Sequence, residues 1–204
     1  MNIGGFSLQK NKHKEERLRK NVTALEFDIF GMTELNTSWR LVNELASLYS
    51  RTRGWWEHLH ICHSFNTSSP PVHQQQWGGT AIFSVNKAAH RVQKKGYDES
   101  NLGRWCWTQY KGQNSHTLHI VSAYRPNFPN GPLSVYTQHR TTLLERGDDR
   151  CPRVAFLEDL LQMLRASLQQ GIHLILLTDG NSSMKNRDLQ VALQGLDMQE
   201  ACLT

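Results

Sequence analysis

The sequence predicts a single α/β or α+β domain over residues 1–204, and three observations favour this class. Helix-like and strand-like segments alternate along the chain, which is typical of mixed domains. No linker and no internal repeat divides it. Apolar residues make up 38% of the chain and charged residues 20%. This composition excludes a disordered chain, and because no apolar run approaches the roughly 20 residues of a spanning helix, we expect no membrane partner.

The first elements are expected to bring a carboxylate to the end of a strand. Residues 1–8 predict a short strand that ends on glycines, and residues 10–25 a charged helix with apolar side chains at helical spacing. The apolar segment 27–32 predicts a buried strand. Glu34 follows directly at its C-terminal end.

An amphipathic helix is predicted next, reaching Tyr49. Thr37 or Ser38 would cap its first turn, because a side-chain oxygen there can accept a free backbone N–H. The buried stripe would consist of three leucines: Leu41, Leu45 and Leu48.

The remaining elements follow from apolar runs, glycines and turn residues. Strands are predicted over residues 55–62, 78–85, 104–111, 117–124 and 172–177. Helices are predicted over residues 134–146, 154–170 and 187–193. The strand over 172–177 is apolar at nearly every position, so we expect it to be central in its sheet. The strands over 104–111 and 117–124 should form an antiparallel pair.

Two carboxylates stand out because each follows an apolar strand. Glu34 and Asp179 occupy these places, and the amides Asn36 and Asn181 lie beside them. Side chains at the C-terminal ends of strands converge on the edge where ligands bind. Mg²⁺ prefers oxygen ligands of this kind. The alternative for either carboxylate alone is a helix cap or a turn former.

Five segments in this order resemble the endonuclease/exonuclease/phosphatase (deoxyribonuclease-I-like) superfamily. They are Asn-Ile-Gly-Gly at 2–5, Phe-Asp-Ile-Phe…Thr-Glu at 27–34, Gly-Gly-Thr-Ala-Ile at 78–82, Ile-Val-Ser-Ala-Tyr-Arg-Pro-Asn at 120–127 and Leu-Ile-Leu-Leu-Thr-Asp-Gly-Asn at 174–181. The segment Leu-Gly-Arg-Trp-Cys-Trp at 102–107 is most similar to endonucleases of non-LTR retroelements. The resemblance implies a four-layer sandwich of two mostly antiparallel sheets with outer helices, here without its last strands.

The resemblance also implies a role for five residues in phosphodiester hydrolysis. Glu34 matches the acidic residue that binds Mg²⁺ or Mn²⁺, and Asn2 matches an Asn near the metal and the scissile phosphate. Tyr124 matches a tyrosine that contacts the phosphate. Asp179 matches the residue that activates the attacking water, and Asn181 the one that stabilises the transition state.

Three further residues are expected to contact substrate: Arg104, Arg125 and Asn127. The net charge of +5 agrees with an anionic partner. Nucleic acid is the expected partner, DNA more than RNA. The expected place of action is intracellular and includes the nucleus, because no signal peptide is visible and the four cysteines have no paired spacing.

The sequence departs from the family pattern at two places. Thr-Asp-Gly-Asn at 178–181 replaces the usual Gly-Asp-Phe-Asn. No histidine follows Asn181, so the family's C-terminal catalytic His segment is not found and the domain is expected to be incomplete at this end. Two alternatives to a retroelement-type endonuclease therefore stay open. One is an inactive remnant that only binds nucleic acid, and the other is a phosphatase of the same superfamily.

Two other groups of residues have competing interpretations. His58, His60 and Cys62 alternate, so they would form either part of a zinc site or, as we favour, a histidine-rich strand that faces solvent. Four tryptophans would either stack on bases or pack in the core: Trp55, Trp56, Trp105 and Trp107.

Overall fold

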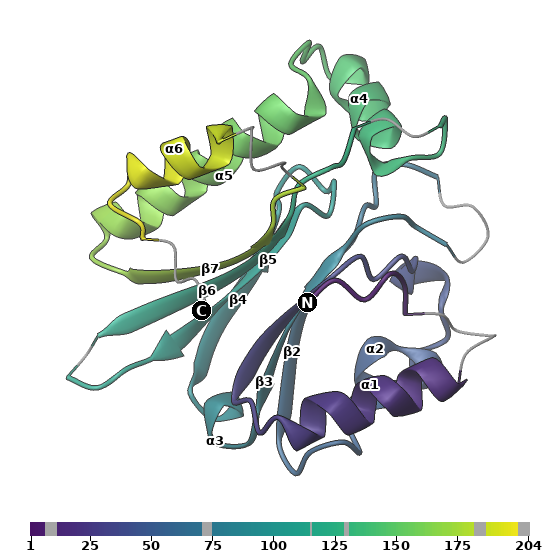
Figure 1. The fold of residues 1–204 in the computed structure, drawn as a ribbon, viewed down its shortest axis with the longest axis vertical. Coiled ribbons are helices and arrows are strands. Elements are labelled where there is room, and N and C mark those ends of the chain that lie inside the picture. Colours follow the sequence, from purple (N-terminus) through teal and green to yellow (C-terminus); the bar gives the residue numbers. More distant parts are fainter. Residues whose placement is uncertain (7–11, 71–74, 115, 129–130, 182–186, 200–204) are drawn as a thin grey trace.

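The computed structural model describes residues 1–6, 12–70, 75–114, 116–128, 131–181 and 187–199. Two β-sheets stack face to face, and helices cover their outer faces, so the molecule has four layers (Figure 1). The predicted sandwich of two mostly antiparallel sheets with outer helices is confirmed. No helix within these ranges is both long and apolar enough to cross a membrane.

The first sheet is antiparallel throughout, with the strand order β1-β3-β2. Its strands are β1 (Ile29–Thr33), β2 (Leu59–Ser64) and β3 (Thr80–Val85). Helices α1 (Lys12–Ala24) and α2 (Leu48–Thr52) lie on its outer face (Figure 1). Alternate side chains of a strand point to opposite faces. Phe30, Met32 and Phe83 accordingly point outward and pack with Val22 and Leu48.

The second sheet has the order β4-β5-β6-β7, and only β6 and β7 run parallel. Its strands are β4 (Val92–Tyr97), β5 (Trp105–Lys111), β6 (Thr117–Tyr124) and β7 (His173–Asp179). Between β6 and β7 the chain forms α4 (Val135–Glu145) and α5 (Pro152–Gln169), the long connection that parallel strands require. Helix α5 and α6 (Asp188–Gln194) cover the outer face, and α4 lies at one end of the sandwich (Figure 1).

The two sheets approach closely where β1 meets β6 and β7. A Cβ atom placed on Gly31 would lie 3.0 Å from the Leu177 side chain and 3.0 Å from Ser122 Oγ. Only glycine fits at that separation without displacing a neighbour. The absence of a side chain at residue 31 therefore allows the C-terminal ends of β1 and β7 to lie side by side.

The predicted helix over residues 37–49 is wrong. The chain instead forms two short 3₁₀ turns, Trp39–Leu41 and Glu44–Ala46, before α2. The Asn43 side chain accepts the N–H of Leu45 and the Ser47 hydroxyl accepts that of Ser50, so local side-chain bonds replace helical ones.

This break in the helix exposes most of the predicted leucine stripe. Leu45 is 84% exposed and Leu41 is 49% exposed, and only Leu48 is buried. Thr37 does not cap a helix. Its hydroxyl donates to the carbonyls of Phe6 and Leu35.

Two strand predictions also need correction, and one further strand lacks a prediction. The strand over residues 172–177 is not central, because among the described strands β7 pairs only with β6, and Ile175 is 45% exposed. Strand β4, together with the short helix α3 (Asn86–Ala89) before it, was not predicted, since the exposed Lys94 and Lys95 hide its alternation. In the opening segment only Asn2 forms a β-bridge, with Thr33, and residues 7 and 8 lie outside the described ranges.

Candidate active site

A cavity of about 1020 Å³ opens at the edge of the sandwich where β1 and β7 end. Its lining comes from the N-terminal segment, from both sheets and from the loop that follows β6. The lining residues are Met1, Asn2, Gly31, Thr33, Ser122, Asn127, Leu177, Thr178, Asp179, Gly180 and Asn181. No histidine is among these described residues. Most of the residues that the sequence nominated lie in this lining or directly beside it.

Glu34 follows β1 in a left-handed backbone conformation, with φ of +56°, and it is half-buried. Asn36 repeats this conformation with φ of +51°. Non-glycine residues adopt such angles at a cost of about 1–3 kcal/mol each, and such residues cluster at functional sites. Hydrogen bonds fix the segment: Gly5 N–H donates to the Glu34 carbonyl at 2.7 Å, and Gly78 N–H to Asn36 Oδ1 at 2.8 Å.

Asp179 and Asn181 are held in place by the backbone of Arg125. The N–H of Arg125 donates to the Asp179 carbonyl at 3.0 Å, and Asn181 Nδ2 donates to the Arg125 carbonyl at 2.7 Å. Asn181 is a third left-handed residue of the site, with φ of +43°. The parallel pairing of β6 with β7 thus places the segment after β6 beside the segment after β7.

Asn2 connects the N-terminal segment to β7. Its Nδ2 donates to Oδ2 of Asp179 at 2.9 Å, and its Oδ1 accepts the N–H of Gly4 at 3.0 Å. Because the Gly4 N–H can only donate, the amide orientation is fixed by its two partners. The Asp179 carboxylate is therefore oriented by a dedicated side chain.

Tyr124 ends β6 near the carboxylates of Glu34 and Asp179. Burial raises the pKa of its phenol, and the negative charge of Glu34, which also lies within hydrogen-bonding reach, raises it further. The charge of Asp179 acts in the same direction, whereas a hydrogen bond with Asn181 acts to lower the pKa. Tyr124 is consequently a protonated donor at neutral pH, and Glu34 and Asp179 lie close enough to act on one hydroxyl.

The structure brings six of the eight nominated residues together: Asn2, Glu34, Tyr124, Asn127, Asp179 and Asn181. Arg125 is next to them, but its side chain is 2% exposed and its guanidinium pairs with the Asp188 carboxylate at 2.9 Å. The expectation that its side chain contacts substrate is therefore corrected: Arg125 positions Asp179 and Asn181 through its backbone.

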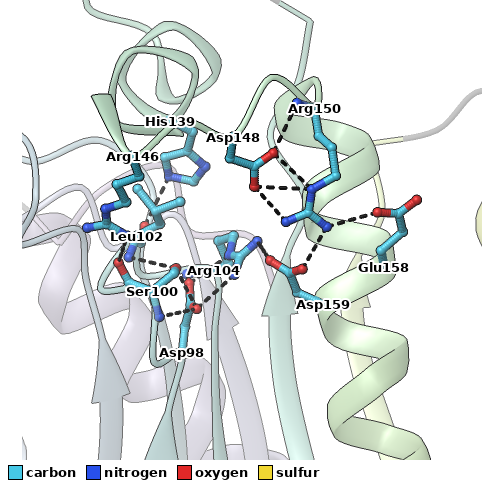
Figure 2. A network of polar contacts seen from close by, with 10 residues as sticks. All are labelled: Asp98, Ser100, Leu102, Arg104, His139, Arg146, Asp148, Arg150, Glu158 and Asp159. Carbon is cyan, nitrogen blue, oxygen red and sulfur yellow. Dashed lines mark hydrogen bonds and ion pairs between the residues drawn. The ribbon is translucent and has the colours of Figure 1, made fainter. Parts of the chain in front are cut away.

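Arg104 lies elsewhere, in a buried network of ion pairs (Figure 2). Its Nε donates to Asp98 at 2.7 Å and its Nη1 to Asp159 at 2.8 Å, and only 2% of the residue is exposed. Burial acts to raise the pKa of Asp98, but the bonds and charge of Arg104 outweigh it and hold that pKa below its ordinary value. Because its guanidinium bonds to carboxylates inside the fold, we expect Arg104 to be structural and not to contact phosphate.

Cys62 and the four tryptophans belong to the packing of the fold, whereas His58 lies before β2 and keeps 46% of its side chain exposed. Cys62 is buried between the sheets, and burial followed by the charge of Lys95 lowers the pKa of the neighbouring His63 to about 4, so β2 is not a solvent-facing histidine strand. Cys62, Cys106 and Cys151 are free thiols. The four nominated tryptophans pack in the two outer cores.

Sequence reasoning missed the part played by Asn36 and Trp77. The sequence indicates only that Asn36 is a neighbour of Glu34, whereas its side chain also connects the Glu34 segment to Gly78. Asn36 and Gly78 are 42 positions apart, so no local sequence pattern indicates this contact. Trp77, directly before Gly78, borders a second cavity of about 330 Å³.

The donor set at the cavity fits a hard divalent cation. Glu34 supplies carboxylate oxygens and Asn2 an amide oxygen, which are ligand types that Mg²⁺ takes, commonly with one or two carboxylates. Within the described residues no group of three or more His, Cys, Asp or Glu side chains could hold a metal. Magnesium bound through fewer carboxylates and water is compatible with that finding.

The sequence matches no family model and no curated protein. Solved structures do match. They include the catalytic domain of human Nocturnin with bound sulfate (16% identity, TM-score 0.57) and an AP endonuclease from Archaeoglobus fulgidus (14%, 0.51). ANGEL2, a 2′,3′-cyclic phosphatase, is a third (10%, 0.53).

The matches cover 93%, 88% and 95% of this chain, in that order. The chain spans 66%, 55% and 49% of the lengths of those three proteins. At these low sequence identities, the structural likenesses show a shared fold alone. The two stacked sheets, their outer helices and these likenesses together show that the chain has the endonuclease/exonuclease/phosphatase, or deoxyribonuclease-I-like, fold.

Proposed function

We propose that this domain is a divalent-metal-dependent phosphodiesterase that acts on nucleic acid, DNA more than RNA, inside the cell. One observation carries the proposal: Asn2, Glu34, Tyr124, Asp179 and Asn181, distant in sequence, converge at one edge of the sandwich around an open cavity. Hydrolysis of a phosphodiester needs an activated water and donors for the charge that develops on the phosphate oxygens. The five side chains supply both.

Asp179 is the proposed general base. Its carboxylate lines the cavity and is oriented by Asn2 at 2.9 Å, the arrangement of a base held by a second group. Asn181 and Tyr124 are the proposed donors to the phosphate. The Asn181 amide bonds to the Arg125 carbonyl and to the Tyr124 hydroxyl, which stays protonated. A bound phosphate would take the place of the bond between Asn181 and Tyr124.

Glu34, together with the Oδ1 atom of Asn2, would hold the cation, Mg²⁺ or Mn²⁺. When bound, such an ion supplies positive charge that stabilises the phosphate oxygens during displacement. Glu34 has a left-handed backbone conformation and lies near Tyr124, and its carbonyl accepts a bond from the Gly5 N–H.

The substrate class rests on charge and on similarity. The chain carries a net charge of +5, and the exposed Asn127 is the proposed contact with the substrate backbone. Structures of the same fold include an AP endonuclease and a 2′,3′-cyclic phosphatase, so both phosphodiester and phosphate-ester substrates are compatible with it. The retroelement type of endonuclease is proposed on the sequence of residues 102–107.

A plasmid-nicking assay tests the function. We expect wild-type protein to convert supercoiled DNA to open circles with Mg²⁺ and not with EDTA. Asp179→Ala should lose this activity, and Asp149→Ala, which removes an exposed carboxylate outside the site, should keep it. Equal nicking by wild type and Asp179→Ala would overturn the proposal.

The same preparations separate the two alternatives. DNA binding by the wild type without nicking would identify a nucleic-acid-binding domain. Phosphate release from sugar or inositol phosphates, with no nicking, would identify a phosphatase.

A further inference from the structure

A second cavity, of about 330 Å³, adjoins the candidate active site. Its lining residues are Trp77, Tyr124, Asn127, Phe128, Leu133, Ser134, Val135 and Tyr136. Asn127 lines both cavities, and Tyr124, which lies beside Glu34 and Asp179, forms part of the second. A ligand with a phosphate in the first cavity can therefore extend directly into the second.

The walls of this second cavity are aromatic and apolar, yet open to solvent. Trp77 is 37% exposed, Phe128 64% and Leu133 51%. Large apolar side chains that gather around one hollow at the surface mark a binding site more often than a chance arrangement. Asn127 and Ser134 add polar atoms to the same lining. Such a lining suits a flat, partly apolar group with polar edges.

Hydrogen bonds on both sides of Trp77 hold its wall in place. On one side the buried Gln76 donates from Nε2 to Gln138 Oε1 at 2.6 Å, and Gln138 in turn donates to the Leu133 carbonyl at 3.2 Å. On the other side the Gly78 N–H donates to Asn36 Oδ1 at 2.8 Å, and the Asn36 N–H donates to the Gly78 carbonyl at 2.9 Å. Trp77 is thus fixed relative both to the Glu34 segment and to Leu133 across the cavity.

Gly78 lets this wall approach α4. Its φ is +85°, and a Cβ atom there would lie 3.3 Å from Val135, so the position combines a left-handed conformation with a close contact. Elsewhere in the lining, the ring of Phe128 has its centre 4.7 Å from the guanidinium of Arg153. Arg153 also donates to the Pro126 carbonyl at 2.7 Å, which steadies the segment that carries Asn127 and Phe128.

We propose that this cavity binds an unpaired nucleobase of the nucleotide whose phosphate occupies the active site. The inference rests on the proposed function and names its substrate more closely. Every nucleobase has a flat face that stacks on aromatic side chains, so the site would tolerate any base sequence. A base within a duplex has both faces covered by its neighbours, so it must be unpaired or extruded to enter. Sugar and inositol phosphates present no such face.

Binding of two oligonucleotides of equal length tests this proposal. One is a single strand with normal bases, and the other has the same backbone with abasic residues throughout. Fluorescence anisotropy is measured in EDTA on the Asp179→Ala background, so that no turnover intervenes. Stacking of one base is worth roughly a 5- to 100-fold change in affinity. We therefore expect the strand with bases to bind about 5- to 100-fold more tightly than the abasic strand.

Trp77→Ala should reduce that preference to within about twofold, since a stacking surface is lost, and Trp77→Phe should keep most of it. Tyr49→Ala, which removes an exposed aromatic from α2, is the matched control and should leave the preference unchanged. Circular dichroism of each variant shows whether it is folded. Equal affinity of the two strands for the parent protein would overturn the base site and leave the nicking result intact. Preference for bases in a protein that does not nick DNA would support the base site and overturn only the proposed catalysis.

Discussion

The side chain of Asn2 donates a hydrogen bond to the carboxylate of Asp179, with 2.9 Å between Nδ2 and Oδ2. The two residues are 177 positions apart, and each is paired with a strand of a different sheet. Asn2 forms a bridge with Thr33 beside β1, and Asp179 pairs with Tyr124 at the end of β6. This single contact therefore connects both halves of the sandwich at the candidate active site.

Replacement of Asn2 should reduce activity more than stability. Asn2→Ala removes the partner that orients Asp179, and loss of such orienting groups lowers activity by about 10- to 100-fold. The free energy of unfolding should change by about 1 kcal/mol or less, because the bond is exposed. Nicking rates and urea denaturation of the same preparation check both expectations.

A second substitution at this position separates orientation from charge. Asn2→Asp places a second carboxylate against Asp179, and two like charges at this distance raise the pKa of one of them. The acid limb of the pH–rate profile should move to higher pH. An unchanged profile together with full activity of Asn2→Ala would contradict the role given to Asn2.

Tyr124 is expected to act as a neutral donor. Tyr124→Phe removes the hydroxyl that lies beside Glu34, and loss of one donor to a developing anion costs about 100- to 1000-fold in rate. Because burial and the charge of Glu34 raise the pKa of this phenol, wild-type activity should not fall through loss of its proton below about pH 10. The pH–rate profiles of both proteins from pH 6 to pH 10 measure this. A basic limb near pH 8 that is absent from Tyr124→Phe would contradict it.

The sequence predicted the placement of Glu34 and Asp179 better than that of Arg104 and Arg125. Glu34 and Asp179 each follow a strongly apolar strand, so their place at a sheet edge could be inferred from local pattern alone. Arg104 and Arg125 could not be assigned in this way. A sequence shows that arginines are present, but their partners Asp98 and Asp188 come from other elements, and the fold alone decides whether a guanidinium faces solvent or a buried carboxylate.

The fold shows the same limit of local pattern. Residues 37–49 carry leucines at helical spacing, but Asn43 and Ser47 bond to nearby backbone N–H groups and interrupt the helix. The strand over 173–179 is apolar enough to be central, yet its position in the sheet depends on which strands pair with it. Strand pairing is a tertiary property. The competition of Asn43 and Ser47 for nearby backbone N–H groups is local, but the spacing of apolar residues does not reveal it.

Arg104 should prove to be structural. Arg104→Met leaves the carboxylate of Asp98, which is 1% exposed, without its cation. Breaking a buried pair in this way costs about 3–5 kcal/mol. Urea denaturation should show that loss, and the double variant Arg104→Met/Asp98→Asn should recover part of it. Arg165→Met, on the exposed side of α5, is the control. A stable Arg104→Met protein with weakened DNA binding would restore the phosphate-contact hypothesis.

Gly31 should tolerate no larger residue. In Gly31→Ala the new methyl group meets Leu177 and Ser122 at 3.0 Å, and overpacking of this kind costs about 1–3 kcal/mol. Gly54→Ala is the matched control, because its Cβ atom meets nothing within 4 Å. Thermal denaturation should separate the two variants. Equal melting temperatures would show that the sheets separate at this point without cost.

His139 should make the fold sensitive to acid. Burial, and then the charge of Arg104, lower the pKa of this imidazole to about 4, while its Nε2 lies 3.0 Å from the Leu102 carbonyl. The ordinary histidine pKa is about 6.5, so as the pH falls the unfolded chain takes up the proton first. The stability that neutral His139 contributes is complete above about pH 6.5 and is lost between there and pH 4. A shift of this size corresponds to about 3 kcal/mol.

His139→Gln keeps a donor for the Leu102 carbonyl but cannot titrate, so its unfolding free energy should fall less between pH 7 and pH 4 than that of the wild type. His13→Gln, at a fully solvated histidine of α1, should behave as the wild type does. Urea titrations at both pH values provide the comparison. His63, whose pKa is also lowered to about 4 by burial, adds a second loss over the same range. The wild type should therefore lose more stability than His139 alone explains, and an identical loss in His139→Gln would assign the whole effect to other groups.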